Sequence, residues 1–327
     1  MTTAVTGASG HLGGNLVRAL LERGEQVRAL VREDTRTLEG LDLELVRGDV
    51  LDPDSLRLAF DGADVVYHLA ACITIGHEQF DTVWNLNSGG PALVADACVD
   101  AGVKRLVHFS SIHAFSPFPI DQTIDETRSL SNPDDASLPL YDRSKASGQL
   151  AVLAAVERGL DAVVVHPTAV IGPYDFKPSK LGSAILAMMT RTLPALVAGG
   201  FDWVDARDVV EGAITAAERG RTGESYLLGG LWRPVAELAQ HVEAACGKRA
   251  PRIVTPMWLA RVGVPFVSAW SKLSGAPPVY TTESLYALRH HRLISCDKAT
   301  RELGYSCRPL AETIADTCAW FRDAGMA

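Results

Sequence analysis

The sequence predicts an α/β fold: a Rossmann-type, doubly wound parallel sheet with a smaller C-terminal α/β lobe for substrate. A glycine-rich turn separates a short apolar strand from a helix near the N-terminus, and strands then alternate with helices as far as residue 172. Such alternation produces right-handed crossovers and a parallel sheet with helices on both faces. From residue 173 the rhythm becomes irregular, without a linker or low-complexity segment. We therefore expect a first domain over residues 1–172 and a lobe over 173–327, with a segment of about 203–219 returning to the first domain.

The N-terminal turn contains glycines spaced three residues apart, at Gly7, Gly10 and Gly13. It lies between a predicted strand over residues 3–6 and a predicted helix over residues 12–23. Glycines let the backbone turn tightly and let phosphates approach without a Cβ in the way. The start of the helix offers free N–H groups and the positive end of its dipole. The turn therefore predicts a site for the pyrophosphate of a dinucleotide, and a glycine-rich turn without a ligand is the alternative.

The other elements of the first domain follow in order. Apolar runs bounded by turn residues predict strands over residues 26–31, 43–46, 64–69, 105–110 and 162–166. Helices are predicted over residues 53–60, with Asp52 as the N-cap, over most of 80–101, and over 141–158. The long polar loop over residues 112–139 is of a length that is usually functional. Ligands on such sheets bind at the carboxyl ends of the strands.

The second half is predicted to be mostly helical. Helices are expected over residues 180–192, within 204–219, and over 235–246, 298–303 and 310–324, with a strand over 225–228. The apolar stretch from Met257 to Trp270 is interrupted by Arg261 and is shorter than the roughly 20 residues that span a bilayer. We expect no integral membrane segment. The stretch is predicted to pack on the body as an amphipathic helix, and contact with a membrane surface is the alternative.

Composition excludes other classes of function. The net charge of −8 disfavours a nucleic-acid partner. The six cysteines form no C-x-x-C pair, so we expect reduced thiols, no metal site and a cytoplasmic location. The first strand begins too close to Met1 to leave room for a signal peptide. A homodimer is left open.

A tyrosine and a lysine carry the predicted chemistry. Tyr141 and Lys145 are four residues apart on one predicted helix, so they share a face. A neighbouring ammonium stabilises a phenolate and lowers the pKa of the phenol, which then exchanges a proton near neutral pH. Ser111, at the end of a predicted strand, supplies a hydroxyl that can hold a substrate oxygen. Each has an ordinary alternative, a surface pair for Tyr141 and Lys145 and a turn or cap serine for Ser111.

Taken together, these motifs resemble the extended short-chain dehydrogenase/reductase family over essentially the whole chain. The resemblance rests on the glycine turn, Gly48-Asp49-Val50, His68-Leu69-Ala70-Ala71, Asn87-Ser88-Gly89-Gly90, Ser110-Ser111, the Tyr141/Lys145 pair, and His166-Pro167-Thr168-Ala169-Val170-Ile171-Gly172-Pro173. It implies an NAD(P)-binding Rossmann domain and an enzyme that uses Ser, Tyr and Lys for hydride-transfer chemistry.

The resemblance also implies a role for each matching residue. Catalysis would involve Ser111 to orient the substrate oxygen, Tyr141 to transfer the proton, Lys145 to bind the nicotinamide ribose and tune Tyr141, and Asn87 to support the site. The cofactor would contact Gly7, Ser9, Gly10, His11, Leu12, Gly13, Asp49, Val50, Leu69, Ala70, Ala71, Pro167, Thr168 and Val170, besides Tyr141 and Lys145.

The cofactor preference depends on Arg32, which follows the second predicted strand. Enzymes that select NAD normally have an acidic residue here for the ribose 2′-hydroxyl. An arginine suits the 2′-phosphate of NADP through its charge and its planar fork of donors. We therefore predict NADP(H), with NAD(H) as the alternative, because the acidic Glu33 and Asp34 follow directly.

Two branches of the family compete for the substrate. The strand before Arg32 and the His166-Pro167-Thr168 segment resemble dihydroflavonol reductase-like carbonyl reductases, which implies an aldehyde or ketone, or the corresponding alcohol. Nucleotide-sugar epimerases and dehydratases with tightly bound NAD are the alternative. They often place an arginine where Phe201 stands, as a clamp for the diphosphate. Arg207 or Arg289 would have to replace that clamp here. A non-catalytic NADP-sensing protein is a third hypothesis, disfavoured by the intact Tyr141/Lys145 pair.

The substrate pocket is expected between the carboxyl edge of the sheet and the C-terminal lobe. Its predicted lining is largely apolar or aromatic, which favours an uncharged and largely apolar carbonyl compound. The candidates are Cys72, Ile73, His113, Tyr174 and Phe201, with Phe115, Phe176, Trp203, Trp232 and Trp258 as further aromatic residues.

Overall fold

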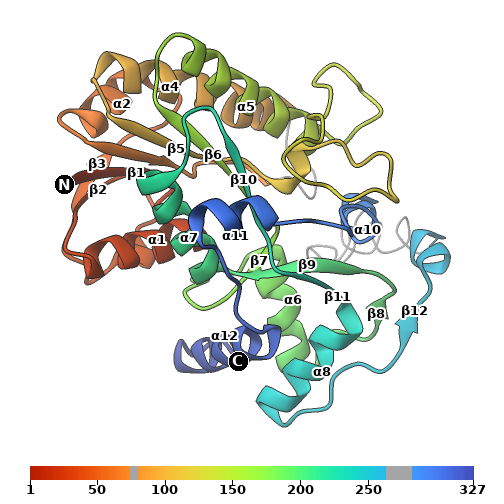
Figure 1. The fold of residues 1–327 in the computed structure, drawn as a ribbon. Coiled ribbons are helices and arrows are strands. Elements are labelled where there is room, and N and C mark those ends of the chain that lie inside the picture. Colours follow the sequence, from red (N-terminus) through yellow and green to blue (C-terminus); the bar gives the residue numbers. More distant parts are fainter. Residues whose placement is uncertain (74–79, 263–281) are drawn as a thin grey trace.

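A computed structural model describes residues 1–73, 80–262 and 282–327 (Figure 1). Its main sheet has seven parallel strands in the order β10-β6-β5-β4-β1-β2-β3. The predicted doubly wound parallel sheet is therefore confirmed. The strands are β1 (Thr2–Thr6), β2 (Gln26–Val31), β3 (Glu44–Arg47), β4 (Val65–His68), β5 (Arg105–Phe109), β6 (Ala162–Pro167) and β10 (Ser225–Leu228).

Helices cover both faces of this sheet (Figure 1). On one face, apolar side chains of α1 (His11–Glu22), α7 (Ala206–Arg219) and α11 (Asp297–Leu303) share a buried cluster with alternate residues of the strands. On the other face, α2 (Pro53–Phe60), α4 (Gly90–Asp100) and α5 (Leu140–Glu157) do the same. Strand side chains alternate between faces, so both clusters are built from the same strands.

The predicted helix over residues 80–101 is interrupted. It consists of α3 (Phe80–Trp84), a π-helical turn η2 (Asn85–Gly89) and α4. Such single π-turns occur frequently at functional sites. Two further short helices are 3₁₀ turns, η1 (Arg36–Leu38) and η3 (Ile112–Ala114), the second of which begins the long loop.

A second, smaller sheet was not predicted from the sequence. It has the order β11-β9-β7 and consists of β7 (Ala169–Ile171), β9 (Gly200–Asp205) and β11 (Leu231–Pro234). The strand β9 is parallel to β7 and antiparallel to β11. A two-stranded pair joins β8 (Leu196–Val197) to β12 (Val254–Thr255). The helices α6 (Lys180–Met189), α8 (Val235–Cys246) and α12 (Leu310–Asp323) share a third apolar cluster with these strands, and α10 (Thr282–Ala287) follows β12.

The two sheets are joined by very short connections. Only Thr168 separates β6 from β7, and only Gly229 and Gly230 separate β10 from β11. A Cβ at Gly230 would lie 1.8 Å from the carbonyl oxygen of Trp203. The division into residues 1–172 and 173–327 stays a prediction.

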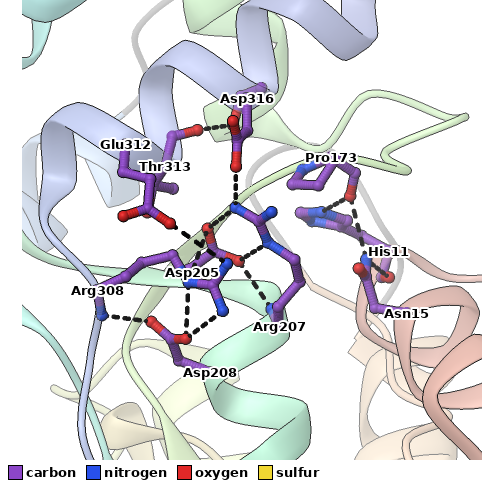
Figure 2. A network of polar contacts seen from close by, with 11 residues as sticks. His11, Asn15, Pro173, Asp205, Arg207, Asp208, Arg308, Glu312, Thr313 and Asp316 are labelled. Carbon is purple, nitrogen blue, oxygen red and sulfur yellow. Dashed lines mark hydrogen bonds and ion pairs between the residues drawn. The ribbon is translucent and has the colours of Figure 1, made fainter.

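Polar contacts fasten α7 to α12 and to the chain before it (Figure 2). Arg207 on α7 pairs with Asp205 and with Asp316 on α12, each at 2.7 Å. Nearby, the Nε of Arg308 donates to Asp208 at 2.8 Å. These pairs are partly buried, so they connect the helices on the main sheet to α12 and to the chain before it.

No helix within residues 1–73, 80–262 and 282–327 is long and apolar enough to cross a membrane. The predicted amphipathic stretch from Met257 to Trp270 is described only as far as residue 262, and its remainder lies outside the described residues.

Candidate active site

The glycine turn between β1 and α1 is built for close backbone approach. Gly7 has φ +71°, and a Cβ there would lie 2.6 Å from the amide nitrogen of Ala70. A Cβ at Gly13 would lie 2.1 Å from the carbonyl oxygen of Gly7. Helix α1 begins after Gly10 with no side-chain cap and no acidic residue in its first turn. Its first N–H groups therefore remain available for an anion.

Neighbouring strand ends close around this turn. The Thr6 hydroxyl lies 2.7 Å from Nδ1 of His68. It also accepts a hydrogen bond from the backbone N–H of Ala70 at 3.4 Å. The backbone N–H of Leu69 donates to the carbonyl oxygen of Thr6 at 3.1 Å. These bonds place the residues that follow β4 directly beside the glycine turn, as expected for residues that contact the same ligand.

Other predicted cofactor residues have structural partners. The His11 ring nitrogen Nε2 lies 3.0 Å from the carbonyl oxygen of Pro173, to which Nδ2 of Asn15 also donates (Figure 2). The Asp49 carboxylate accepts the N–H of Leu51 at 2.9 Å. The predicted contacts of His11 and Asp49 with a cofactor are not tested by these bonds and stay predictions.

Arg32 is exposed at the end of β2. Within the described part of the chain, its guanidinium has no hydrogen-bond or ion-pair partner. Of the two acidic residues that follow Arg32, Asp34 forms an ion pair with Arg36 at 2.7 Å. A cation without a protein partner stands where the adenosine ribose is expected.

The three predicted catalytic residues come together at the ends of β5 and α5. Ser111 begins η3, where its hydroxyl accepts the N–H of His113 at 3.2 Å. Lys145 is buried, with 3 % exposure, and its Nζ donates to the carbonyl oxygen of Phe109 at 2.8 Å. Tyr141 lies one turn earlier on α5. This arrangement holds a hydroxyl, a phenol and an ammonium around one edge of the sheet.

The pKa values differ from the expectation. Burial raises the pKa of Tyr141 to about 12, and its interaction with the Ser111 hydroxyl opposes that rise. Burial lowers the pKa of Lys145 to about 8. The expected lowering of the Tyr141 pKa by Lys145 is therefore wrong for the protein by itself. The cause is desolvation, which disfavours both the phenolate of Tyr141 and the ammonium of Lys145.

Three buried histidines surround Lys145, and the sequence analysis did not find this cluster. His68, His108 and His166 lie on β4, β5 and β6, on the face that α5 covers, and each has a pKa lowered by burial and by Lys145. The rings of His68 and His108 stack with centroids 5.3 Å apart. Both ring nitrogens of His108 lack a partner among the described residues. All three rings are therefore neutral at physiological pH.

Asn87 supports the site through the backbone. Its side-chain amide donates to the carbonyl oxygen of Cys72 at 2.8 Å and accepts the N–H of Cys72 at 2.7 Å. It also donates to the hydroxyl of Ser144 at 3.1 Å. A Cβ at Gly148 would lie 2.1 Å from the carbonyl oxygen of Asn87. The π-helical turn thus fixes the segment after β4 against α5, beside Tyr141.

His113 is the predicted substrate residue that lies nearest the catalytic group. Its ring is edge-on to that of Tyr141, with centroids 5.6 Å apart. Its Nδ1 lies 3.1 Å from Asp142, whose carboxyl group is 2 % exposed. On its other side, the ring of His291 lies at 4.8 Å. The sequence analysis missed Asp142 and His291.

The remaining substrate candidates are dispersed. Tyr174 packs over the Arg18 guanidinium of α1 at 4.5 Å and lies near Trp320 of α12. Phe201 packs edge-on to Trp203 at 5.1 Å. Ile73 is 59 % exposed. Contacts of these residues and of Cys72 with substrate stay predictions.

A cavity of about 610 Å³ lies in the C-terminal lobe. Apolar and aromatic side chains make up most of its wall, and none of the described residues that line it is acidic. The Arg292 guanidinium stands 4.6 Å over the ring of Trp232. The lining residues are Ala198, Gly199, Trp232, Pro234, Met257, Trp258, Arg261, Leu288, Arg289 and Arg292. His291, between the lining residues Arg289 and Arg292, contacts His113, which in turn contacts Tyr141. The segment that lines the cavity therefore also reaches the residues around Tyr141.

A family model described as the NAD dependent epimerase/dehydratase family matches residues 3–229, which include the glycine turn, Ser111, Tyr141 and Lys145. The chain belongs to this family. It is an NAD(P)-dependent oxidoreductase of the extended short-chain dehydrogenase/reductase type, and the resemblance inferred from the sequence is confirmed.

Relatives of this epimerase/dehydratase-family protein match it from end to end. It is 36% identical to "Sterol demethylase protein B" of Methylococcus capsulatus, with 100% of both chains covered. It is 32% identical to a "Putative dihydroflavonol 4-reductase" of Synechocystis sp., with 98% of this chain and 94% of the relative covered. The crystal structure of gox2253 is 32% identical, covers 99% of both chains and superposes with a TM-score of 0.85.

The residues present fit the nicotinamide dinucleotide that the family implies. A side chain at Gly7 or Gly13 would collide with neighbouring backbone, so the turn is reserved for close packing, and the uncapped start of α1 suits a pyrophosphate. The exposed Arg32 suits a further phosphate. Lys145 and Tyr141 stand at the other end of the strand edge, where a nicotinamide ribose would be held.

Proposed function

We propose that this protein is an NADPH-dependent oxidoreductase that reduces an aldehyde or ketone to an alcohol, or catalyses the reverse reaction, on a largely apolar substrate. The observation that carries the proposal is the gathering of Ser111, Tyr141 and Lys145 at the end of β5. The partly apolar cavity and the reductase name of one relative support the reductase branch.

In the proposed reaction, Ser111 and Tyr141 hold the carbonyl oxygen from two sides. Tyr141 donates its phenolic proton to that oxygen as negative charge develops on it. A phenol with a raised pKa stays protonated at neutral pH, so it is a proton donor in the reduction direction. When bound, the cofactor supplies the hydride. Lys145 is placed to hold a ribose and to stabilise the phenolate that remains on Tyr141.

Arg32 supports the preference for NADPH. Its guanidinium is exposed, and no described acidic residue pairs with it. A 2′-phosphate would form a charge-assisted, two-pronged contact with such a group, whereas a 2′-hydroxyl would leave its charge unmatched.

One observation favours the second candidate, a nucleotide-sugar epimerase or dehydratase with tightly bound NAD. Arg261, Arg289 and Arg292 line the cavity without an acidic residue among them, which suits a diphosphate. Arg207 does not suit that role, because Asp205 and Asp316 already bind it. A clamp at Arg289 would explain why Phe201 occupies the position of the usual arginine.

The two candidates differ in net cofactor turnover. A reductase consumes NADPH stoichiometrically with a carbonyl substrate, whereas an epimerase or dehydratase returns its cofactor to the starting state. We would incubate the purified protein with NADPH and a panel of apolar and aromatic aldehydes and ketones, and separately with nucleotide-sugars. Loss of nicotinamide absorbance with carbonyls supports the proposal. Conversion of nucleotide-sugars without net absorbance change, together with no response to carbonyls, would overturn it.

A further inference from the structure

A reductase of the proposed kind must replace a proton on Tyr141 in every cycle. Donation of the phenolic proton to the carbonyl oxygen leaves a phenolate, and the next turnover requires a phenol. Burial raises the pKa of Tyr141 and makes that phenolate a strong base. A neighbouring group that exchanges protons with solvent can return this proton to Tyr141 directly.

The groups beneath Tyr141 are poorly placed for this exchange. Lys145 is 3 % exposed and donates to Phe109. The three histidines around it are at most 1 % exposed, and burial lowers the pKa of each of them. Neutral rings enclosed on the covered face of the sheet have no contact with bulk water.

His113 also lies beside Tyr141, and it has contact with water. Its side chain is 25 % exposed, and its ring is edge-on to the Tyr141 ring. The Ser111 hydroxyl accepts a hydrogen bond from the backbone N–H of His113 and also interacts with Tyr141. Ser111 therefore fixes the start of η3, and with it His113, beside Tyr141. Histidine is the side chain that most readily exchanges protons near neutral pH.

Asp142 orients this ring. Its Oδ1 lies 3.1 Å from Nδ1 of His113, which directs Nε2 away from the carboxylate. Its Oδ2 is buried and has no partner among the described residues, so His113 is the one side chain in the described ranges that forms a hydrogen bond with this carboxylate. A buried carboxylate in this position selects the tautomer of the ring and stabilises the imidazolium.

We propose that His113, oriented by Asp142, is the proton donor that restores Tyr141 after each reduction, a role that rests on the proposed reductase function. The Nε2–H bond of the imidazolium breaks and an O–H bond forms on the Tyr141 phenolate, directly or through one water. The neutral imidazole then takes a proton from solvent, and no proton moves to Asp142. In alcohol oxidation the proton moves in the opposite direction.

The test compares kcat for carbonyl reduction by the wild type, His113→Gln and Asp142→Asn at saturating NADPH between pH 6 and 9. Glutamine keeps a donor for Asp142 but carries no transferable proton. We expect His113→Gln to lower kcat about 100-fold with KM changed less than about twofold, and added imidazole to restore part of the rate. Wild-type kcat should fall between pH 6 and pH 9, and this dependence should be absent in His113→Gln.

Controls separate this role from simple packing. His241→Gln changes a histidine of similar exposure on α8, paired with Glu237, and should leave kcat and its pH profile unchanged. The charged or titratable groups that face His113 are Tyr141, Asp142, His290 and His291, so His291→Gln is measured as well and should retain the pH dependence. If His113→Gln fails to fold, Asp142→Asn decides, because it keeps the ring and should shift the falling limb of the profile to lower pH.

Each failure has its own signature. Carbonyl reduction by His113→Gln within twofold of wild type, or a lowered kcat with an unchanged pH profile and no rescue by imidazole, overturns the role of His113 and leaves the proposed function standing. Conversion of nucleotide-sugars without net NADPH change would overturn both the proposed reductase function and the role of His113, because Tyr141 would then regain its proton within the catalytic cycle.

Discussion

The ammonium group of Lys145 donates a hydrogen bond to the carbonyl oxygen of Phe109, with 2.8 Å between Nζ and the oxygen. Phe109 is the last residue of β5, two positions before Ser111. The bond therefore fixes α5 to the strand end that is followed by Ser111, the predicted catalytic serine, and it places Tyr141, one turn earlier on the same helix, at that end. The lysine has a positioning role in the protein before any ligand is considered.

Removing the phenolic oxygen should separate chemistry from binding. We expect Tyr141→Phe to reduce kcat by at least 100-fold while changing the Kd for NADPH less than threefold, because only the transferable proton is lost. Stopped-flow turnover and fluorescence titration would measure the two quantities. A variant with near-normal kcat would refute the assignment of Tyr141.

Removing the buried ammonium should weaken NADPH binding yet stabilise the protein without cofactor. Because the pKa of Lys145 is lowered to about 8, the folded state holds its proton less tightly than the unfolded state, and wild-type stability should rise between pH 8 and 10.5. Lys145→Met should remove this rise and gain about 2 kcal/mol at pH 7, after allowance for the lost hydrogen bond to Phe109. Urea unfolding at pH 7 and 10 would measure it, with the exposed Lys104→Met as control. Equal slopes of stability with pH in wild type and variant would contradict the prediction.

Arg32 should discriminate between the two cofactors. Arg32→Ala is expected to weaken NADP(H) by about 1.5–3 kcal/mol, at least tenfold in Kd, and to leave NAD(H) almost unchanged. Arg57→Ala, an exposed arginine paired with Asp54 on α2, removes the same charge elsewhere and should change neither affinity. Equal affinities of the wild-type protein for NADP(H) and NAD(H) would show that Arg32 does not select the phosphate.

Two glycine substitutions should have opposite effects. In Gly13→Ala the new Cβ would meet the carbonyl oxygen of Gly7 at 2.1 Å, so we expect a loss of about 1–3 kcal/mol of stability and of measurable dinucleotide binding. In Gly89→Ala the Cβ has no neighbour within 4 Å and φ is −67°, so stability should be unchanged or higher by up to about 1 kcal/mol. Thermal unfolding with and without NADPH measures both. Normal binding by Gly13→Ala would exclude the turn as the pyrophosphate site.

The buried histidines should make the protein sensitive to acid. Burial lowers the pKa of His108 well below its usual value, so unfolding takes up a proton below about pH 6.5 and stability falls as the pH decreases from there. His108→Leu should gain stability at pH 5 relative to pH 7.5, by up to about 1.4 kcal/mol per pH unit below 6.5. Unfolding midpoints at both pH values test this, and His241→Gln serves as the exposed control. An equal effect of His108→Leu at both pH values would show that His108 does not titrate on unfolding.

Local patterns predicted much of the fold. Asp52 accepts the N–H groups of Asp54 and Ser55 and starts α2 as expected, and α8 ends at Gly247, whose φ is +68°. Such boundaries depend on neighbours in sequence. The strands β7, β9 and β11 were missed because they pair with one another across 28 to 34 residues, so their stability comes from partners that no local window contains.

The same distinction applies to the site. The glycine turn and the Tyr141/Lys145 spacing are local and could be recognised. The pair of His113 and Asp142 is separated by 29 positions, and His68, His108 and His166 become neighbours only through the order of β4, β5 and β6. Nor could the raised pKa of Tyr141 be foreseen, because it depends on how deeply the fold buries the phenol.

The small sheet β11-β9-β7 has a consequence for protein engineering. Its strands leave or enter the main body at three places: β7 directly follows β6, β9 directly precedes α7, and β11 directly follows β10. A designer who wishes to exchange the substrate-recognising half for that of a relative cannot transplant it as one continuous cassette. Such a chimera needs junctions at Thr168, at Asp205, at Gly229-Gly230 and on both sides of α11, and α7 and α11 must stay with the recipient. Gradual redesign of the cavity wall is therefore the more practical route to new specificity.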